Sequence, residues 1–273
     1  FDKTIPFKKN FQFKKFLITE NSKWRDIFYD ETNNFKNYKL KEKNQDLFKS
    51  RKISKYETSD YILLDNKNIF TNDIKGNLII FSILENNVLQ KYNFYKKKYK
   101  KIEKKLNIAL DKNILFVSDN LGYLYSYDYN ANKILWAKNF KIPFRSNLKI
   151  FEDKLILSNQ NNHLYFVDKK NGSILKLIPT EETIVKNKFI NNISVNNDST
   201  FFLNTFGSLY SIDNKKMQIN WFINLNKNSS LNPSDLFFGN KLINSKDKII
   251  VTTNFFTYIM DNNTGSILYK KNF

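Results

Sequence analysis

The sequence contains no cysteine, a single histidine and only six glycines among its 273 residues. Without cysteine, neither a disulfide bond nor a thiolate metal site can form. The histidine, His163, has no second imidazole to complete a metal pair, and its place at a predicted strand start indicates a polar surface residue. With so few glycines, the sequence has no phosphate-cradling glycine-rich loop and no Gly-x-Ser-x-Gly motif.

Long apolar runs are missing too. No stretch of about 18 apolar residues is present, so no membrane-spanning helix is expected. The sequence starts at Phe1 without a methionine or a signal-like apolar region, so we expect either a removed targeting segment or a fragment. Alanine is scarce, whereas aromatic residues make up 16% of the chain. This composition predicts an all-β fold, because aromatic side chains favour half-buried pleated surfaces.

The chain carries a formal net charge of +19, which can indicate a nucleic acid or an anionic membrane surface as partner. Only three of its 45 basic residues are arginines, the residue preferred for base readout and bidentate phosphate contacts. Lysine, asparagine and isoleucine are abundant together, as is typical of an AT-rich genome. We therefore interpret the charge, including the lysine-rich run 95–105, mainly as solvated surface, with a role in binding as the alternative.

One arrangement recurs along the chain. Residues 122–128 read as a short strand, residues 129–132 as a polar turn and residues 133–136 as a second strand. Further copies lie at residues 76–90, 163–176, 207–221 and 256–269. In the clearest copy Asp128 precedes Trp136 by eight positions, and the other copies keep this spacing. Successive aspartates of this column lie 40, 45 and 48 positions apart. A strand-rich repeat of about 40–50 residues predicts propeller blades.

The expected fold is therefore an all-β propeller of four-stranded antiparallel blades, with about five clear blades over residues 62–273. The predicted blades cover about residues 62–94, 106–140, 147–178, 192–225 and 240–273. Residues 1–61 are irregular, with candidate strands at 15–18 and 26–29, and are predicted to hold a degenerate blade or a closing strand. Because an open array exposes blade edges, we expect either an incomplete ring from a truncated chain or closure through residues 1–61.

The repeated residues are predicted to be structural. The aspartates that end the third strands are Asp128, Asp168, Asp213 and Asp261. A carboxylate there can accept backbone N–H groups of the following turn, which we favour over a ring of carboxylates around a cation. Trp136 and Trp221, with Tyr269 in the same column, are predicted to pack between blades. Gly172 and Gly265 suit the left-handed position of a tight hairpin. No catalytic, cofactor-binding or metal residue is predicted.

Residues 124–136 carry the pattern Leu-Tyr-x-x-Asp followed by Ile-x-Trp. This pattern resembles the repeat of PQQ-like (pyrroloquinoline-quinone-type) β-propellers, Leu-Tyr-Ala-Leu-Asp followed by Thr-Gly-x-x-x-Trp. The turns at 171–172 and 263–265 match it as well. The usual small alanine is replaced by Ser126, Phe166 and Ser211. The resemblance covers about residues 62–273 and implies the fold, whereas the same fold serves unrelated tasks.

Within these propellers, the chain is most similar to the family of the outer-membrane assembly lipoprotein BamB, in its alphaproteobacterial form. The resemblance implies a non-enzymatic, periplasmic or outer-membrane-associated scaffold without a cofactor, which binds the periplasmic domains of the insertase BamA. The family has an exposed apolar–arginine segment between blades that contributes to this contact. Phe144 and Arg145 are its counterparts here, with an ordinary connector as the alternative. The family's lipid-anchoring cysteine is absent, so membrane contact would need an anchor outside this sequence.

Two other functions stay open. A PQQ-dependent dehydrogenase-type propeller would be an enzyme, but such enzymes are longer and commonly place a vicinal cysteine pair over the cofactor. They also bind calcium through a carboxylate–asparagine site, which the sequence does not recognisably contain. A generic peptide- or nucleic-acid-binding propeller is the other alternative. Tight binding of PQQ and calcium would favour the enzyme, whereas strongly salt-dependent binding to DNA or RNA would favour the nucleic-acid-binding propeller.

Overall fold

The computed structural model describes residues 4–8, 23–35, 48–65, 67–183, 190–226, 239–253 and 255–272. Within these residues the chain forms five sheets, each of four antiparallel strands. The same residues contain no α-helix, and one 3-10 turn, η1 (Lys97–Tyr99), lies between the first and second sheets. None of the described residues forms a helix long and apolar enough to cross a membrane. The all-β fold predicted from the sequence is confirmed.

The strands follow one another in chain order within every sheet. The first sheet comprises β1 (Leu63–Leu64), β2 (Asn68–Asn72), β3 (Asn77–Ser82) and β4 (Asn87–Asn93). The second comprises β5 (Leu106–Asp111), β6 (Ile114–Asp119), β7 (Tyr123–Asp128) and β8 (Lys133–Asn139). The third comprises β9 (Lys149–Phe151), β10 (Lys154–Ser158), β11 (Leu164–Asp168) and β12 (Ile174–Ile178). The fourth comprises β13 (Asn192–Val195), β14 (Ser199–Leu203), β15 (Ser208–Asp213) and β16 (Ile219–Asn224). The fifth comprises β17 (Gly239–Ser245), β18 (Lys248–Thr253), β19 (Phe256–Asp261) and β20 (Ile267–Asn272).

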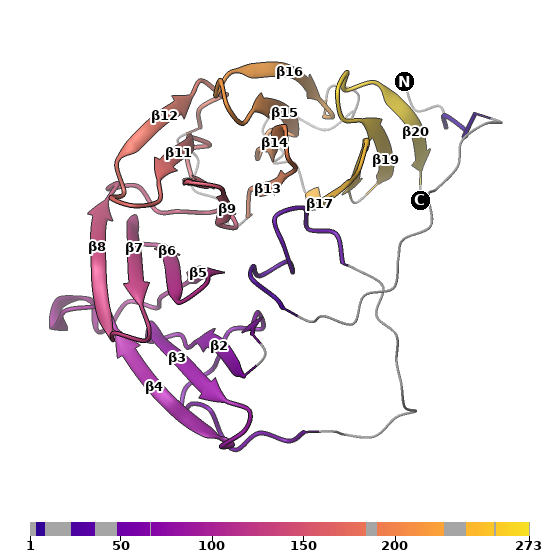
Figure 1. Cartoon of the computed structure of the whole chain (residues 1–273). Coiled ribbons are helices and arrows are strands. Elements are labelled where there is room, and N and C mark those ends of the chain that lie inside the picture. Colours follow the sequence, from indigo (N-terminus) through magenta and orange to yellow (C-terminus); the bar gives the residue numbers. More distant parts are fainter. Residues whose placement is uncertain are drawn as a thin grey trace.

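The five sheets are arranged side by side around an arc, with the first strand of each towards the middle and the fourth at the outer rim (Figure 1). Hairpins join consecutive strands within each sheet, and the chain then passes to the next sheet. This is the blade arrangement of a β-propeller. The described residues form an open arc rather than a full circle, because the first and fifth sheets are not neighbours (Figure 1).

The apolar core lies between neighbouring blades. Phe70 and Leu78 of the first sheet pack in one buried cluster with Leu115 and Val117 of the second. Equivalent clusters join the second to the third sheet, the third to the fourth and the fourth to the fifth. The middle strands are therefore largely buried, while the fourth strands of the first three sheets, at the rim, are largely exposed. Full burial of one large apolar side chain contributes about 1.5–3 kcal/mol, so these interfaces supply most of the stabilisation.

Every blade carries a β-bulge at the same place, between its third and fourth strands. The register shifts after Ile80, Ser126, Phe166, Ser211 and Ile259. The extra residues of the fourth strands are Leu89, Leu135, Leu175, Asn220 and Leu268. A bulge inserts one residue and increases the local twist. Because the bulge falls inside the interval from the aspartate to the tryptophan column in every blade, the eight-residue spacing stays constant.

Residues 26–29 correct one expectation. Predicted as a strand, they form a tight turn in which Tyr29 N–H donates to the carbonyl oxygen of Asp26 at 2.9 Å and Tyr29 has a φ of 88°. The Asp26 carboxylate also accepts the N–H of Phe28 at 2.8 Å. A short polar side chain that bonds the nearby backbone competes with strand pairing, which explains the turn. The candidate strand at 15–18 lies outside the described residues.

Residues 4–8 lie along the outer edge of β20. Ile5 and Lys270 exchange two backbone hydrogen bonds of 2.8 and 3.1 Å. Phe7 stacks on Tyr269 with the ring centroids 4.0 Å apart. The outer edge of the fifth blade is thus covered by the N-terminal part of the chain, in the way that an added strand covers an exposed edge.

Candidate functional site

Residues 23–35 lie on the inner side of the arc, where a propeller has its axis (Figure 1). Backbone hydrogen bonds of 2.8–2.9 Å connect this axial segment to the first strands of four blades. They join Trp24 with Leu64 of β1, Arg25 with Leu110 of β5, Glu31 with Val195 of β13, and Thr32 with Asn244 of β17. The first strand of the remaining blade, β9, reaches the segment through a side chain. The axial segment therefore contacts the first strand of all five blades.

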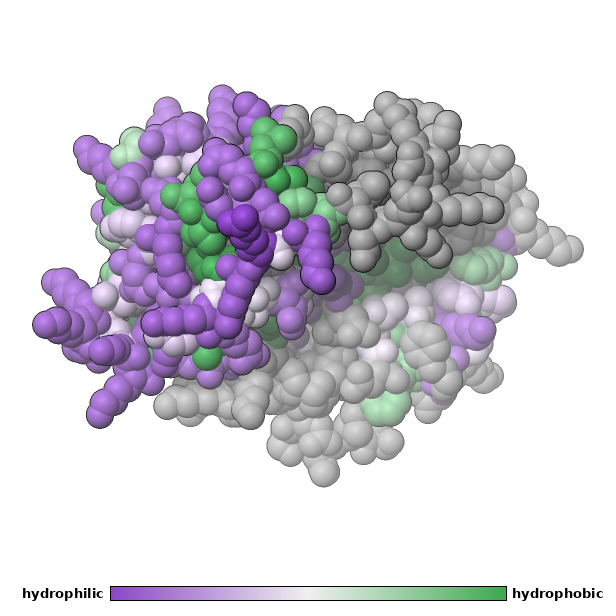
Figure 2. Space-filling model, turned by 90° about the horizontal axis from the view of Figure 1, so that it is seen from below, coloured by the Kyte–Doolittle hydropathy of each residue, from purple (hydrophilic) through white to green (hydrophobic). Residues whose placement is uncertain are grey.

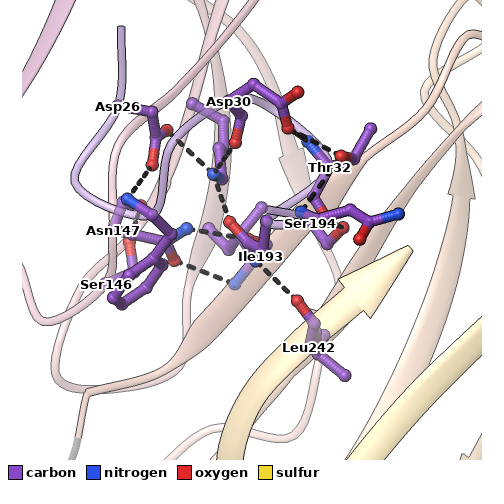
Figure 3. Close-up of polar contacts among 12 residues, drawn as sticks. Asp26, Asp30, Thr32, Ser146, Asn147, Ile193, Ser194 and Leu242 are labelled. Atoms are coloured by element: carbon purple, nitrogen blue, oxygen red, sulfur yellow. Dashed lines mark hydrogen bonds and ion pairs between the residues drawn. The ribbon is translucent and has the colours of Figure 1, made fainter. Parts of the chain in front are cut away.

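Lys149 of β9 makes that contact. Its side chain is fully buried, and its Nζ lies 2.8 Å from Oδ2 of Asp26. The ammonium group also donates to the carbonyl oxygen of Asp30 at 2.9 Å and to Oδ1 of Asn33 at 2.5 Å. Figure 3 shows the Asp26 carboxylate and the backbone carbonyl oxygen of Asp30 turned towards this shared position, whereas the Asp30 carboxylate contacts Thr32. All three partners of the ammonium group belong to the axial segment, so a single lysine fixes this segment against the third blade.

Asn33 extends the network towards the fourth and fifth blades. Its amide Nδ2 donates to the carbonyl oxygens of Ile193, at 2.9 Å, and Leu242, at 2.7 Å (Figure 3). Asn147, from the third blade, donates to the same Ile193 oxygen at 2.7 Å and accepts the Ile193 N–H at 2.9 Å. Two buried asparagines therefore link three neighbouring blades around the axis.

Burial disfavours the charged forms of Asp26 and Lys149. Burial raises the pKa of Asp26, while the nearby Lys149 ammonium group acts in the opposite direction. Burial likewise lowers the pKa of Lys149, and the Asp26 carboxylate counteracts this. Removing either partner would leave the other charge buried without compensation. The loss of one partner is therefore expected to destabilise the fold strongly.

Beside the segment lies a small hollow of about 280 Å³, in which Lys169 and Asp111 form an ion pair of 2.9 Å. No group of three or more His, Asp or Glu side chains that could hold a metal ion occurs within the described residues. The polar groups that converge on Lys149 all accept hydrogen bonds from its ammonium group. We interpret the axial segment as the common attachment of the blades.

The aspartate column caps hairpins. Oδ1 of Asp128 accepts the N–H groups of Asn130 and Ala131, both at 3.0 Å. Asp168, Asp213 and Asp261 accept the equivalent pair of N–H groups, two and three positions further along the chain. These are Asx turns, which satisfy backbone donors where a strand reverses. The four carboxylates belong to four separate blades.

A second repeated column was missed in the sequence. It lies in the hairpin between the second and third strands, where Oδ1 of Asp119 accepts the N–H groups of Leu121, at 2.9 Å, and Tyr123, at 2.8 Å. The same role is filled by Asp73, Asn159, Asn204 and Thr253. Because the acceptor changes among aspartate, asparagine and threonine, residue identity hides the repeat. The detectable signal is a short oxygen-bearing side chain a few positions before each third strand.

The tryptophan column connects adjacent blades. The indole Nε1–H of Trp136 donates to the carbonyl oxygen of Lys169 in the next blade at 3.1 Å. Its ring covers Gly172, where an added Cβ would lie only 2.7 Å from the ring. Trp221 repeats both features, with Gly265 beneath its ring. Gly172 and Gly265 also have positive φ values of 73° and 70°, so both the backbone and the neighbouring ring require glycine there.

The structure separates the two residues proposed for partner contact. Phe144 is only 3% exposed and packs against Tyr165 in the core between the second and third blades. Phe144 is therefore a core residue, and its ring is not available as an exposed apolar surface for a partner. Arg145 is partly exposed, and its role in partner binding stays a prediction. His163, whose Nε2 lies 3.0 Å from a carboxylate oxygen of Glu182, is a partly exposed residue at the start of β11.

The outer rim exposes apolar side chains on the fourth strands of four blades. They are Val88 and Leu89 on β4, Leu135 on β8, Ile174, Leu175 and Leu177 on β12, and Phe222 on β16. Among the described residues, no further strand pairs with the outer edges of these four strands. The outer edge of β20, by contrast, pairs with Ile5, and the apolar residues Ile267 and Leu268 of that strand are only partly exposed.

Together, the blades and their repeated caps define an all-β propeller built from four-stranded units. The sequence matches no known family model and no curated protein. Among solved structures, the chain is similar to BamB from Moraxella catarrhalis, with a TM-score of 0.56 and 11% identity over 78% of this chain. It is also similar to the computationally designed Ika8 protein, with a TM-score of 0.61 and 10% identity over 77% of this chain. The chain spans 60% of the length of each, and the likeness shows the fold.

Proposed function

We propose that this chain is a non-enzymatic propeller scaffold of the PQQ-like repeat type, which binds a protein partner through its outer rim. The proposed role is BamB-like, in outer-membrane β-barrel assembly, with the periplasmic domains of BamA as partner and the periplasm as location. The similarity to the BamB structure supports a propeller scaffold. The observation that carries the proposal is the exposed apolar rim of the third and fourth blades.

Within the part of the chain that the structure describes, the rim of these two blades lacks the usual protection of an edge strand. Ile174 and Leu177 of β12 are 54% and 45% exposed, and Phe222 of β16 is 60% exposed. Proteins commonly protect free edges with charged side chains, because an unpaired edge can pair with another chain. In β12 the only charged residue is Lys176, and β16 contains none. Exposed apolar side chains along free backbone edges are typical of protein interaction sites.

The partner that fits such an edge is an extended segment with alternating apolar side chains. It would add a strand to the sheet, gaining affinity from main-chain hydrogen bonds and specificity from side-chain contacts. The chain makes this contact with itself at the fifth blade, where Ile5 pairs with Lys270 and Phe7 covers Tyr269. The covered rim of β20 supports the same kind of contact for the rims of β12 and β16.

The test is calorimetric titration of the chain with the BamA periplasmic domains of the same organism. Replacing Ile174 and Phe222 by serine removes two large apolar contacts, and we expect at least about tenfold weaker binding, since 1.4 kcal/mol changes a Kd tenfold. Leu84→Ser is the matched control, because Leu84 is 81% exposed in the β3–β4 turn, away from this rim. Its affinity should stay within about twofold of the wild type.

Two results would contradict the proposal. If the wild-type chain does not bind the BamA domains, the BamB-like role is wrong. If it binds but I174S/F222S and L84S have equal affinities, the contact lies elsewhere on the propeller.

A further inference from the structure

The lysine-rich run 95–105 is more than a connector between the first two blades. Together with the turn before β3, it lines a hollow of about 1010 Å³. Six lysines surround this hollow: Lys75, Lys96, Lys97, Lys100, Lys101 and Lys104. The remaining lining residues are two tyrosines and two asparagines, so no acidic side chain of the described residues belongs to the lining. Figure 2, seen from the side of the first sheet, shows hydrophilic side chains projecting over much of this face.

One side of the hollow is built around the ring of Tyr56. The ammonium groups of Lys55, Lys75 and Lys91 lie 5.1, 5.7 and 5.9 Å from the centre of this ring. A tyrosine ring attracts cations, but three like charges around one ring repel each other. Of these three lysines, only Lys91 forms an ion pair within the described part of the chain, 3.4 Å from Asp73, whose side chain is fully buried. The cluster therefore keeps an uncompensated positive charge.

The other side is built around Tyr95 and is rigid. The Tyr95 hydroxyl donates to Oδ2 of the buried Asp119 at 2.7 Å, and its ring packs against Gly76. The ammonium group of Lys104 lies 5.1 Å from the centre of the same ring and donates to the carbonyl oxygen of Tyr99. Burial lowers the pKa of Lys104, and the charge of the nearby Lys75 adds to this effect. Asp119 accepts hydrogen bonds from Tyr95 and from its own turn. Among the described residues, no carboxylate therefore lines the open side of the hollow.

We propose that this basic hollow binds an acidic segment of a protein, a run of several aspartate or glutamate side chains. Its ammonium groups are point charges that suit single carboxylates, and the lining contains none of the arginines that favour bidentate phosphate contacts. The tyrosine rings are occupied by ammonium groups or by Gly76, so they give nucleic-acid bases no free stacking surface. The volume is sufficient for a short stretch of polypeptide.

The experiment uses fluorescence anisotropy with a labelled peptide of eight glutamates, at low and moderate salt. Labelled octaglutamine and a labelled thymidine octanucleotide are measured in the same way for comparison. The variant K75E/K101E reverses two charges of the hollow, and K215E/K216E makes the same change at exposed lysines of the fourth blade. We expect the wild-type chain to prefer octaglutamate over both other probes and K75E/K101E to bind at least about tenfold more weakly, with K215E/K216E within about threefold.

A second measurement needs no variant. Lysine acetylation followed by mass spectrometry should show that octaglutamate protects Lys97, Lys100 and Lys101 of the wild-type chain, while Lys215 and Lys216 react unchanged. The proposal is overturned if octaglutamate does not bind, if both charge variants lose affinity equally, if protection is uniform, or if the oligonucleotide binds more tightly. This site is separate from the apolar rim, so I174S/F222S should bind octaglutamate like the wild type, and failure at one site leaves the other proposal standing.

Discussion

Replacing Lys149 with methionine tests the axial network most sharply. Methionine keeps much of the side-chain length but removes the ammonium group that contacts Asp26, the Asp30 carbonyl oxygen and Asn33. Asp26 is itself only 4% exposed, so the change leaves a buried carboxylate without its ion-pair partner. Breaking a buried pair in this way costs about 3–5 kcal/mol, a large share of the 5–15 kcal/mol that stabilises a typical domain. Urea unfolding measures the loss.

The matched control is Lys154→Met. Lys154 also forms an ion pair, of 2.7 Å, but the side chain of its partner Asp153 is 60% exposed, so we expect a loss of at most about 1 kcal/mol. In the double variant D26N/K149M, asparagine can still accept the Phe28 N–H without leaving a buried charge. Its destabilisation should be smaller than the sum of the two single variants by at least about 1 kcal/mol. The reasoning is refuted if K149M costs no more than K154M or if the two axial substitutions add without coupling.

Two further predictions concern the repeated positions. Gly172→Ala should destabilise the chain by at least about 1–2 kcal/mol, because φ is 73° and the new Cβ would meet the Trp136 ring; a loss below about 0.5 kcal/mol in urea unfolding would contradict this. The Ala131 N–H, first among several causes, holds the pKa of Asp128 below its ordinary value. Asp128 therefore stabilises the fold above the unfolded-state pKa of about 3.9, and this contribution disappears as the pH falls through the lower folded-state pKa. The difference in urea midpoint between the wild type and D128N should be larger at pH 6 than at pH 2.5, whereas an unchanged difference would refute the role of the charge.

The blades could be predicted from the sequence because each is built from local contacts. A hairpin joins strands that are close in the chain, and its turn depends on a few local residues, such as Asp128 before one turn and Gly172, with its positive φ, in another. The bulge leaves the spacing between these positions unchanged, so the repeat stays visible despite low similarity among the copies.

The axial segment could not be predicted in the same way. Asp26 and Lys149 are 123 positions apart, and neither has a local pattern that indicates a buried partner. The apolar sequence from Ile27 to Tyr29 resembles a strand. The Asp26 carboxylate, which accepts the Phe28 N–H, and the Asp26 carbonyl oxygen, which accepts the Tyr29 N–H, instead close it into a tight turn. Phe144 was misplaced for a similar reason, since a short apolar–arginine match says nothing about which side chain faces the neighbouring blade.

The most direct test of the axial segment as the common attachment of the blades is native-state hydrogen exchange of three amides. The N–H groups of Leu110, Val195 and Asn244 belong to three different blades, and each donates to a carbonyl oxygen of residues 25–32. If one segment holds these strands, their protection should fall together in K149M, while amides in the middle of β11 keep theirs. Wild-type protection of all three amides in K149M would contradict the attachment of the blades through the axial segment.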